Sequence, residues 1–379
     1  MRLYPIAILA FVLTGCSVFS DKDGTEPMEL VEFDPSITVE QLWRTDVGAG
    51  QGKGFTALTP AFFEQLVYTV DHKGQLTALN RLTGKVIWQR DLDEPIAGGV
   101  GLGENQLLLG SDAGQLLALS RETGETLWRT QLTGEVTSVP AGNGDVVAVQ
   151  TLDGRLNVLS ADTGEIMWFY DNPPPKLTLR GRPTPILTDS ALYAGFANGR
   201  LMAFNPENGL ILWEQRVGLP KGRSDLEKMV DIHATPVLQD GILYTAGFQS
   251  RAMAITRAAG RPLWSVDLST HQPVWVDDGE LFVTTEDSAL KAYNAGTGEL
   301  LWKNEQMLRR HLIGPVVLND YVAVADEDGY IHFMSRDDGH FAYRLRLDRS
   351  GTRAPMWSDG DRLYVLANDG TFAAFTIGD

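Results

Sequence analysis

One motif recurs along almost the whole chain and constrains the fold more than any other feature. It reads Gly-x-Leu-x-Ala-Leu-x-x-x-Thr-Gly-x-x-x-Trp, and its clearest copies begin at Gly74, Gly114 and Gly154. Weaker copies begin at residues 199, 250, 288, 329 and 370, so the spacing is mostly 38 to 45 residues, with one interval of 51. A period of this length is typical of the blades of a β-propeller. The sequence therefore predicts an all-β chain folded as an eight-bladed β-propeller.

Each part of the motif has a physical role in such a blade. Leu76 and Ala78 alternate with polar neighbours, as a strand with one buried face requires. The Thr-Gly pair supplies the positive φ that reverses the chain into the next strand, and the Trp can fill the wedge that widens between blades. A second pair of short strands lies upstream of most copies, and a Pro often opens the innermost strand, as at Pro236 and Pro315. We therefore expect four antiparallel strands in each blade.

The last copy of the motif is incomplete. It starts at Gly370, and the sequence stops at Asp379 before any Trp. The missing pattern stands near the other end, in Gln41-Leu42-Trp43-Arg44-Thr45, which has no preceding strand of its own. We expect the strand around Trp43 to complete the blade built from residues 355–376, because this closes the ring and removes both free sheet edges. The propeller is accordingly assigned to residues 37–379.

The N-terminal residues have the pattern of a lipoprotein signal. Residues 1–15 combine a minimal positive start with an apolar run that is too short to span a bilayer, which is typical of an export signal. They end in Leu13-Thr14-Gly15-Cys16, which matches the bacterial lipobox and predicts that Cys16 carries the lipid. Ser17 stands where inner-membrane lipoproteins typically have Asp, so this resemblance implies an outer-membrane anchor facing the periplasm of a Gram-negative bacterium. Residues 16–36 are acidic and lack an apolar period, which predicts a flexible tether.

Composition excludes several classes of protein. The chain has 32 Lys and Arg against 49 Asp and Glu, a net charge of −17, so a nucleic acid is disfavoured as a partner. Cys16 is the single cysteine, which excludes disulfide frameworks and cysteine-based zinc sites. The glycines of Gly48-x-Gly50-x-Gly52-x-Gly54 are followed by Thr59-Pro60 rather than a helix, so a dinucleotide-binding loop is excluded. The six histidines show no metal-ligand spacing. We predict no catalytic residues, cofactor or metal.

Two longer connections interrupt the regular pattern, at residues 171–183 and 217–233. They fall on consecutive blade boundaries, and long loops on a rigid scaffold are where recognition usually occurs. In the first loop, Leu177 and Leu179 are followed by Arg180, an apolar pair beside a hydrogen-bonding cation, as in many binding hot spots. The alternative is that both leucines tuck under the loop as local core.

The lipobox, the acidic segment and the eight repeats together resemble the BamB family of outer-membrane protein assembly factors. Leu177-Thr178-Leu179-Arg180-Gly181 matches a Leu-Ser-Leu-Arg-Gly loop of that family. Met229-Val230-Asp231-Ile232-His233-Ala234-Thr235-Pro236 matches a second family string, with His233 in place of its second Asp. The resemblance implies that Leu177, Leu179, Arg180, Asp231 and His233 dock on the POTRA domains of BamA. It also implies a non-enzymatic scaffold of the BAM complex that assists folding and insertion of outer-membrane proteins and could contact their unfolded precursors.

An enzyme is the competing hypothesis. The Ala-x-x-x-x-Thr-Gly-x-x-x-Trp core is similar to the tryptophan-docking motif of periplasmic dehydrogenases that use pyrroloquinoline quinone (PQQ). Those enzymes are longer and commonly carry adjacent cysteines under the cofactor, whereas the one cysteine here is Cys16. The motif therefore predicts the propeller fold and not quinone chemistry.

Overall fold

The computed structural model describes residues 26–54, 56–179 and 183–378. Residues 1–15, Cys16 and Arg180 lie outside the described residues. All regular elements in the described part of the chain are β-strands, β1 to β33. None of these residues belongs to a helix long and apolar enough to cross a membrane.

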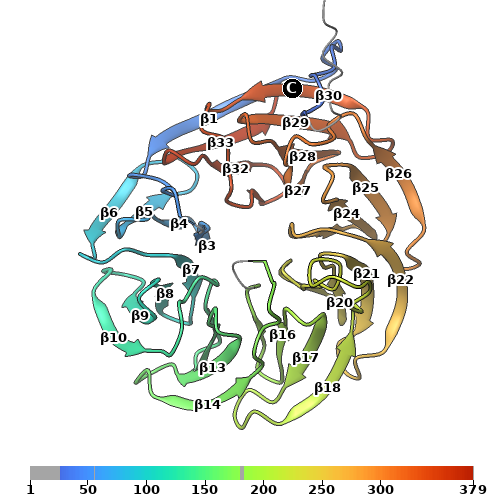
Figure 1. Cartoon of the computed structure of the whole chain (residues 1–379). Helices are drawn as coiled ribbons and strands as arrows, with labels where there is room; N and C mark the ends of the chain where they lie inside the picture. The colour runs from blue at the N-terminus through green and yellow to red at the C-terminus, as the bar shows by residue number, and fades with distance from the viewer. Residues whose placement is uncertain (1–25, 55, 180–182, 379) are drawn as a thin grey trace, which may run out of the picture.

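Eight sheets are arranged around a central axis (Figure 1). Each blade has four antiparallel strands that follow one another in sequence from the axis to the rim, apart from the last blade. Blades 1 to 4 contain β3 (Ala61–Phe63), β4 (Leu66–Val70), β5 (Gln75–Asn80) and β6 (Val86–Asp91); β7 (Gly98–Leu102), β8 (Gln106–Gly110), β9 (Gln115–Ser120) and β10 (Thr126–Gln131); β11 (Ala141–Gly142), β12 (Val146–Gln150), β13 (Arg155–Ser160) and β14 (Ile166–Asp171); and β15 (Ile186–Leu187), β16 (Leu192–Gly195), β17 (Arg200–Phe204) and β18 (Ile211–Arg216).

The second half of the ring repeats this arrangement. Blades 5 to 7 contain β19 (Val237–Gln239), β20 (Ile242–Thr245), β21 (Ser250–Thr256) and β22 (Pro262–Leu268); β23 (Trp275–Asp277), β24 (Glu280–Thr284), β25 (Leu290–Asn294) and β26 (Leu300–Asn304); and β27 (Ile313–Leu318), β28 (Tyr321–Ala325), β29 (Tyr330–Ser335) and β30 (Phe341–Arg346). Blade 8 contains β31 (Trp357–Ser358), β32 (Leu363–Leu366), β33 (Thr371–Ile377) and, at the rim, β1 (Val39–Asp46). The predicted eight-bladed propeller is confirmed.

The ring closes through blade 8 as the sequence predicts. β1 pairs antiparallel with β33, and Trp43 lies opposite Ala374 in this pairing. Trp43 packs edge-on against Phe372, with ring centroids 5.3 Å apart. The outermost strand of blade 8 therefore comes from the start of the propeller sequence, and the three inner strands come from its end. This pairing joins the two ends of the propeller inside one sheet.

The Trp of each motif joins one blade to the next. Trp128 of blade 2, for example, donates a hydrogen bond from Nε1 to the carbonyl of Ala161 in blade 3, at 2.7 Å. Its ring lies over Gly164, whose φ of +72° is the positive value that the Thr-Gly turn requires. The same Trp-to-carbonyl bond is present from Trp43, Trp168, Trp213, Trp264 and Trp302. The repeated motif is thus a docking contact between neighbouring blades.

Blade 2 has a feature that the repeat does not predict. The short strand β2 (Ala57–Leu58) pairs in parallel with β7 at the axial edge of the blade, giving a five-stranded sheet. The glycine-rich segment before it is fixed by hydrogen bonds from Arg353 to the carbonyls of Gly52 and Gly54. These contacts tie Gly52 and Gly54 to the connection between blades 7 and 8.

Residues 26–36 differ from the tether that the sequence predicts, because they lie across blade 7. Met28 N donates to the carbonyl of Leu308 at 3.0 Å, and Ser36 N donates to the carbonyl of Ala342 at 3.0 Å. Phe33 stacks on Phe341 with ring centroids 5.2 Å apart. We call residues 26–36 the strap. The described part of the predicted tether is therefore held on the blade, since apolar side chains of the acidic segment find partners there.

A buried polar network lies next to the strap. The Asp326 carboxylate accepts hydrogen bonds from Arg310 at 2.8 Å and from His332 at 3.0 Å, and Asp326 and His332 are fully buried. Arg344 donates to the other ring nitrogen of His332, so the histidine is neutral with its proton on Nε2. Burial lowers the pKa of His332. Burial raises the pKa of Asp326, but the hydrogen bonds that its carboxylate accepts from His332, Tyr330 and Arg310 outweigh this and hold the pKa below its usual value.

Candidate functional site

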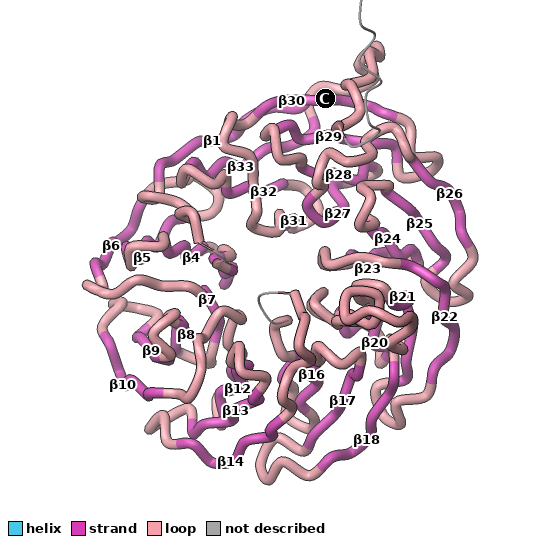
Figure 2. The backbone as a smooth tube through the Cα atoms, viewed as in Figure 1, coloured by secondary structure: helices cyan, strands magenta, loops and turns pink. Residues whose placement is uncertain are grey.

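The two long connections follow the outer strands of blades 3 and 4. Residues 172–185 lead from β14 to the innermost strand of blade 4, and residues 217–236 lead from β18 to the innermost strand of blade 5. Because each runs from an outermost strand to the next innermost strand, both lie at the same end of the propeller. Figure 2 shows loop segments gathered between β16 and β21, toward the axis. The structure thus places the two predicted recognition loops side by side.

A hydrogen bond joins the two loops directly. Thr178 donates from Oγ1 to Oδ2 of Asp231 at 2.6 Å, and Thr184 N donates to Oγ1 of Thr235 at 3.2 Å. Asp231 is itself fixed on blade 5, because its backbone exchanges two hydrogen bonds with Phe248. A hydrogen bond to a carboxylate is stronger than one between neutral groups. The conformation of the first loop is therefore coupled to that of the second.

The predicted site residues occupy different depths. Leu177 is on the surface with 44% of its area exposed, whereas Asp231 is buried with 1% exposed. Leu179 and His233 are half-buried and line the same central cavity. The structure thus brings Leu179 and His233 to one cavity, leaves Leu177 on the surface and buries Asp231 within the second loop.

The second loop contributes two exposed leucines that the sequence analysis did not identify. Leu219 and Leu226 are 44% and 61% exposed. Leu226 stands on a tight turn in which the carboxylate of Glu227 accepts hydrogen bonds from the backbone N–H groups of Arg223 and Ser224. These bonds lower the pKa of Glu227. A Ser three residues before a Glu is the sequence signal for this turn. The two loops together expose Leu177, Leu219 and Leu226.

The cavity on the axis has a volume of about 440 Å³ and a mixed polar lining. His233, His271 and His311 reach it from three successive blade boundaries, and Arg353 reaches it from the next one. Burial lowers the pKa of His271, and nearby His311 adds to the shift while Glu286 opposes it. No group of three acidic, cysteine or histidine side chains among the described residues could hold a metal ion.

This cavity does not match the cofactor site that the dehydrogenase hypothesis requires. In those enzymes the site commonly contains adjacent cysteines, whereas the one cysteine of this chain is Cys16, which is not among the residues that line the cavity. It also needs acidic ligands for calcium, and Glu286 is the one acidic residue in the lining. The lining can form hydrogen bonds and apolar contacts.

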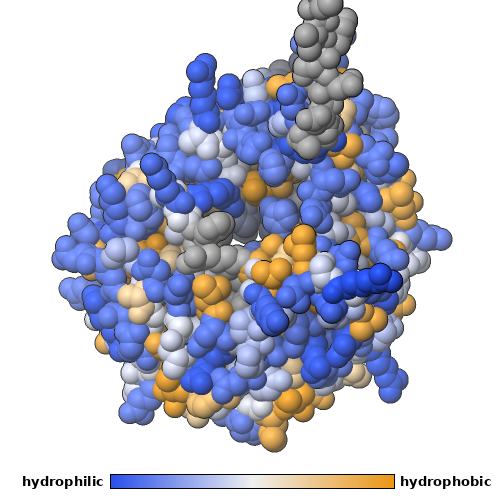
Figure 3. Space-filling view, in the orientation of Figure 1, coloured by the Kyte–Doolittle hydropathy of each residue, from blue (hydrophilic) through white to orange (hydrophobic). Residues whose placement is uncertain are grey.

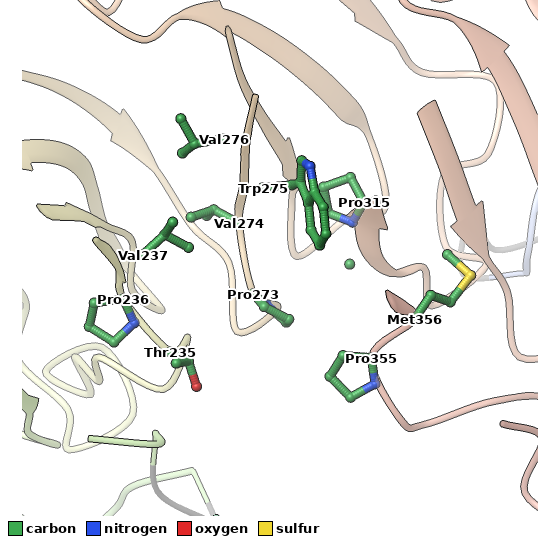
Figure 4. A pocket seen from close by; sticks show the side chains of 11 residues that line it. Thr235, Pro236, Val237, Pro273, Val274, Trp275, Val276, Pro315, Pro355 and Met356 are labelled. Carbon is green, nitrogen blue, oxygen red and sulfur yellow. The ribbon is translucent and has the colours of Figure 1, made fainter. Parts of the chain in front are cut away.

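A second, apolar cavity of about 260 Å³ opens on the axial side of blades 5 to 8. Figure 4 shows Trp275 and Pro315 on one side of the space and Pro355 and Met356 on the other. The prolines lie in or just before the innermost strands, where they add rigid apolar surface and no backbone N–H group.

Comparisons with known proteins agree with the repeat and with the fold. The profile of a family described as outer membrane protein assembly factor BamB matches residues 28–98, 72–304 and 286–379. A protein of that name from Pseudomonas aeruginosa is 45% identical over 97% of both chains. One from Yersinia pestis is 31% identical over 96% of both chains.

Solved structures show the same relationship. The crystal structure of BamB from Moraxella catarrhalis superposes with a TM-score of 0.81 at 25% identity, covering 89% of this chain and all of that one. A quinohemoprotein alcohol dehydrogenase from Comamonas testosteroni has a TM-score of 0.70 at 13% identity, covering 89% of this chain and 76% of that one. The second likeness concerns the fold alone.

Proposed function

The chain belongs to the family of the outer membrane protein assembly factor BamB, and on this premise we propose that it is a non-enzymatic scaffold of the BAM complex that binds the POTRA domains of BamA. The observation that carries the proposal is the coupling of two neighbouring long loops through Thr178 and Asp231. A rigid propeller that presents two coupled loops suits a scaffold, because little conformational entropy is lost when the loops bind.

The residues of this surface have different roles in the proposal. Leu177 is exposed and contacts BamA directly, together with Arg180, which lies outside the described residues. Asp231 is a positioning residue, because it is buried and holds Thr178. Leu179 and His233 form the floor where the loops meet the central cavity. Leu219 and Leu226 extend the apolar surface across the second loop.

The test is capture of BamA from detergent-solubilised envelopes by the tagged full-length protein. Leu177→Glu and the double variant Leu179→Ala/Arg180→Glu should each lower BamA recovery about tenfold, since each removes a central apolar contact. The matched control is Leu42→Glu on the rim of blade 8, where the leucine is 41% exposed. Full recovery of BamA by both loop variants, with unfolding curves unchanged, would contradict the proposed surface.

We also propose that Cys16 carries a lipid that anchors the protein to the outer membrane, with the propeller in the periplasm. The lipobox of residues 13–16 supports this, as do the relatives named as outer membrane assembly factors in Gram-negative bacteria. Cys16→Ser should move the protein from the membrane fraction to the soluble periplasmic fraction. Its continued presence in the membrane fraction of cells depleted of BamA would count against the anchor.

The dehydrogenase alternative has a separate test. A protein with a bound quinone would absorb visible light and reduce a dye when an alcohol or a sugar is added. We expect neither signal from the protein purified from its native envelope, with or without added PQQ and calcium. Dye reduction that depends on PQQ would overturn the scaffold proposal.

A further inference from the structure

The rim of the propeller repeats one exposed apolar position. In each outer strand the residue before the Trp forms a β-bulge, so two residues of that strand lie opposite one of its neighbour. In seven blades this residue is aliphatic and 41–54% exposed. The seven are Leu42, Ile87, Leu127, Met167, Leu212, Leu263 and Leu301. A single exposed aliphatic side chain in a blade is ordinary surface.

Blade 7 differs because a segment of the chain itself covers its rim. The bulge residue there is Ala342, which is 1% exposed, and its carbonyl accepts the hydrogen bond from Ser36 of the strap. Phe33 stacks on the neighbouring Phe341. The guanidinium of Arg344 lies 5.0 Å from the Phe33 ring and donates to the carbonyl of Val31. The rim of one blade thus holds an extended peptide through backbone hydrogen bonds and ring contacts.

The strap also shows what kind of peptide such a rim accepts. Met28, Leu30, Val31 and Phe33 are half-buried, whereas the acidic residues between and beside them are exposed. The strap forms no strand. A peptide therefore needs only closely spaced apolar side chains on one side to bind such a rim. The bulge leaves a backbone carbonyl that can accept a hydrogen bond, and binding removes the apolar side chains from water.

Blades 3 and 4 offer the largest uncovered surface of this type among the described residues. Three residues at β14 and three at β18 are 45–65% exposed: Ile166, Met167 and Phe169, and Leu210, Ile211 and Leu212. Figure 3 shows hydrophobic residues gathered at this part of the rim. We call these six residues the rim patch. Its halves adjoin, because Trp168 of β14 donates to the carbonyl of Pro206 just before β18.

Two ion pairs flank the rim patch. Arg155 binds Asp171 at 2.7 Å and lies 4.2 Å from the Phe169 ring, and Arg200 binds Glu214 at 3.2 Å. β14 and β18 each have a single neighbouring strand, so their outer edges keep backbone N–H and C=O groups that a further chain could bind. An apolar surface with open strand edges is suited to an extended apolar chain.

We propose that the rim patch binds unfolded, extended polypeptide with alternating apolar side chains, in the way that the strap binds blade 7. Strands of outer-membrane β-barrels have this alternation, with apolar residues facing lipid. The proposal rests on the proposed function, because an assembly factor for outer-membrane proteins meets such chains before they fold. The patch lies on the rim and the loops assigned to BamA lie at one end of the propeller, so both partners can bind one molecule together.

The test uses the full-length protein with a photo-crosslinking amino acid at Met167 or Leu212 in cells that are synthesising outer-membrane proteins. The matched control is Leu263, which is 51% exposed, as is Leu212, and stands alone on blade 5. We expect crosslinks to barrel precursors from both patch positions and none from the control. Crosslinks only to BamA, only to a second copy of this chain or only to lipid would each overturn the proposal.

A second measurement uses the purified protein and a labelled synthetic peptide of twelve residues in which Val, Leu or Tyr alternates with Thr or Asn. Met167→Glu/Leu212→Glu should weaken binding about tenfold, because two desolvated aliphatic contacts are lost. Leu263→Glu/Leu301→Glu is the control and should leave binding unchanged. Capture of BamA is measured on the same variants. If all variants bind the peptide equally and still capture BamA, the rim-patch proposal alone is refuted. If the unaltered protein does not capture BamA, the proposed function is refuted.

Discussion

Gly164→Ala tests whether the Trp of the repeat is a tight contact between blades. Gly164 has φ of +72°, and a Cβ added there would lie 2.5 Å from Cε3 of Trp128 and 2.7 Å from Oγ1 of Thr130. The Trp128 ring cannot simply move away, because it is 9% exposed and its Nε1 is bonded to the carbonyl of Ala161. The substitution therefore combines a backbone cost with a steric cost.

The two costs can be estimated separately. The left-handed conformation costs an L-residue about 1–2 kcal/mol, and overpacking a filled site costs about 1–3 kcal/mol. Gly164→Ala should therefore lower the free energy of unfolding by roughly 2–5 kcal/mol. Gly241→Ala is the matched control, because Gly241 has φ of +77° and a Cβ there would meet no atom within 4 Å. This control should cost about 1–2 kcal/mol, since only the backbone cost applies.

The measurement is equilibrium unfolding in urea, followed by circular dichroism so that the reporter does not depend on Trp128. The same pair of glycine variants is then made in a Trp128→Ala background. There the steric cost should disappear, so that Gly164→Ala costs no more than Gly241→Ala. Equal costs of the two glycine substitutions in the unaltered protein would refute the docking interpretation.

Three further predictions concern the closure of the ring and the buried network of blade 7. Deleting residues 41–47 removes most of β1 and exposes the edge of β33, so the melting temperature should fall strongly, and an unchanged value would contradict closure through blade 8. Asp326→Asn leaves the buried Arg310 without its buried carboxylate and should cost about 3–5 kcal/mol in urea unfolding. Asp328→Asn removes a half-exposed partner of the same arginine and should cost about 0–1 kcal/mol, and equal costs would argue against a dependence on burial. The pKa of His332 and that of Asp326 are both lower in the folded protein than in the unfolded chain. Each group therefore contributes stability that is fully present above its unfolded pKa and is lost as the pH falls, so the free energy of unfolding should begin to decline below about pH 6.5, the unfolded pKa of a histidine. His332→Gln should make the decline that begins there shallower, and an unchanged decline would argue against a role of His332.

The sequence predicts the propeller well because each copy of the repeat contains both parts of the contact between neighbouring blades. The Gly of the turn and the Trp that follows it are four residues apart, and each Trp meets the turn of the next blade. Even the closing strand could be predicted, since the pattern around Trp43 is the part that the last copy lacks. The repeated motif, together with its incomplete last copy, therefore specifies the topology of the whole ring.

The strap could not be predicted in the same way. Its acidic residues are typical of a solvated segment, and the apolar residues between them show no clear period. Their partners Leu308, Phe341 and Arg344 lie about 300 residues later in the sequence, where nothing local marks them as a binding surface. The candidate site shows a similar limit, because Asp231 is buried by its pairing with Phe248 and by its bond to Thr178, neither of which the sequence indicates.

With a lipid on Cys16, as we propose, the strap would also determine which side of the molecule lies toward the membrane. Glu26 lies ten positions after Cys16, the residue on which we propose the lipid, so this span can reach at most about 36 Å. The strap lies on blade 7, and blade 3 stands four blades away, on the opposite side of an eight-bladed ring (Figure 1). The lipid would hold the rim of blade 7 close to the bilayer and turn the β14 half of the rim patch toward the interior of the periplasm, the direction from which newly exported chains arrive.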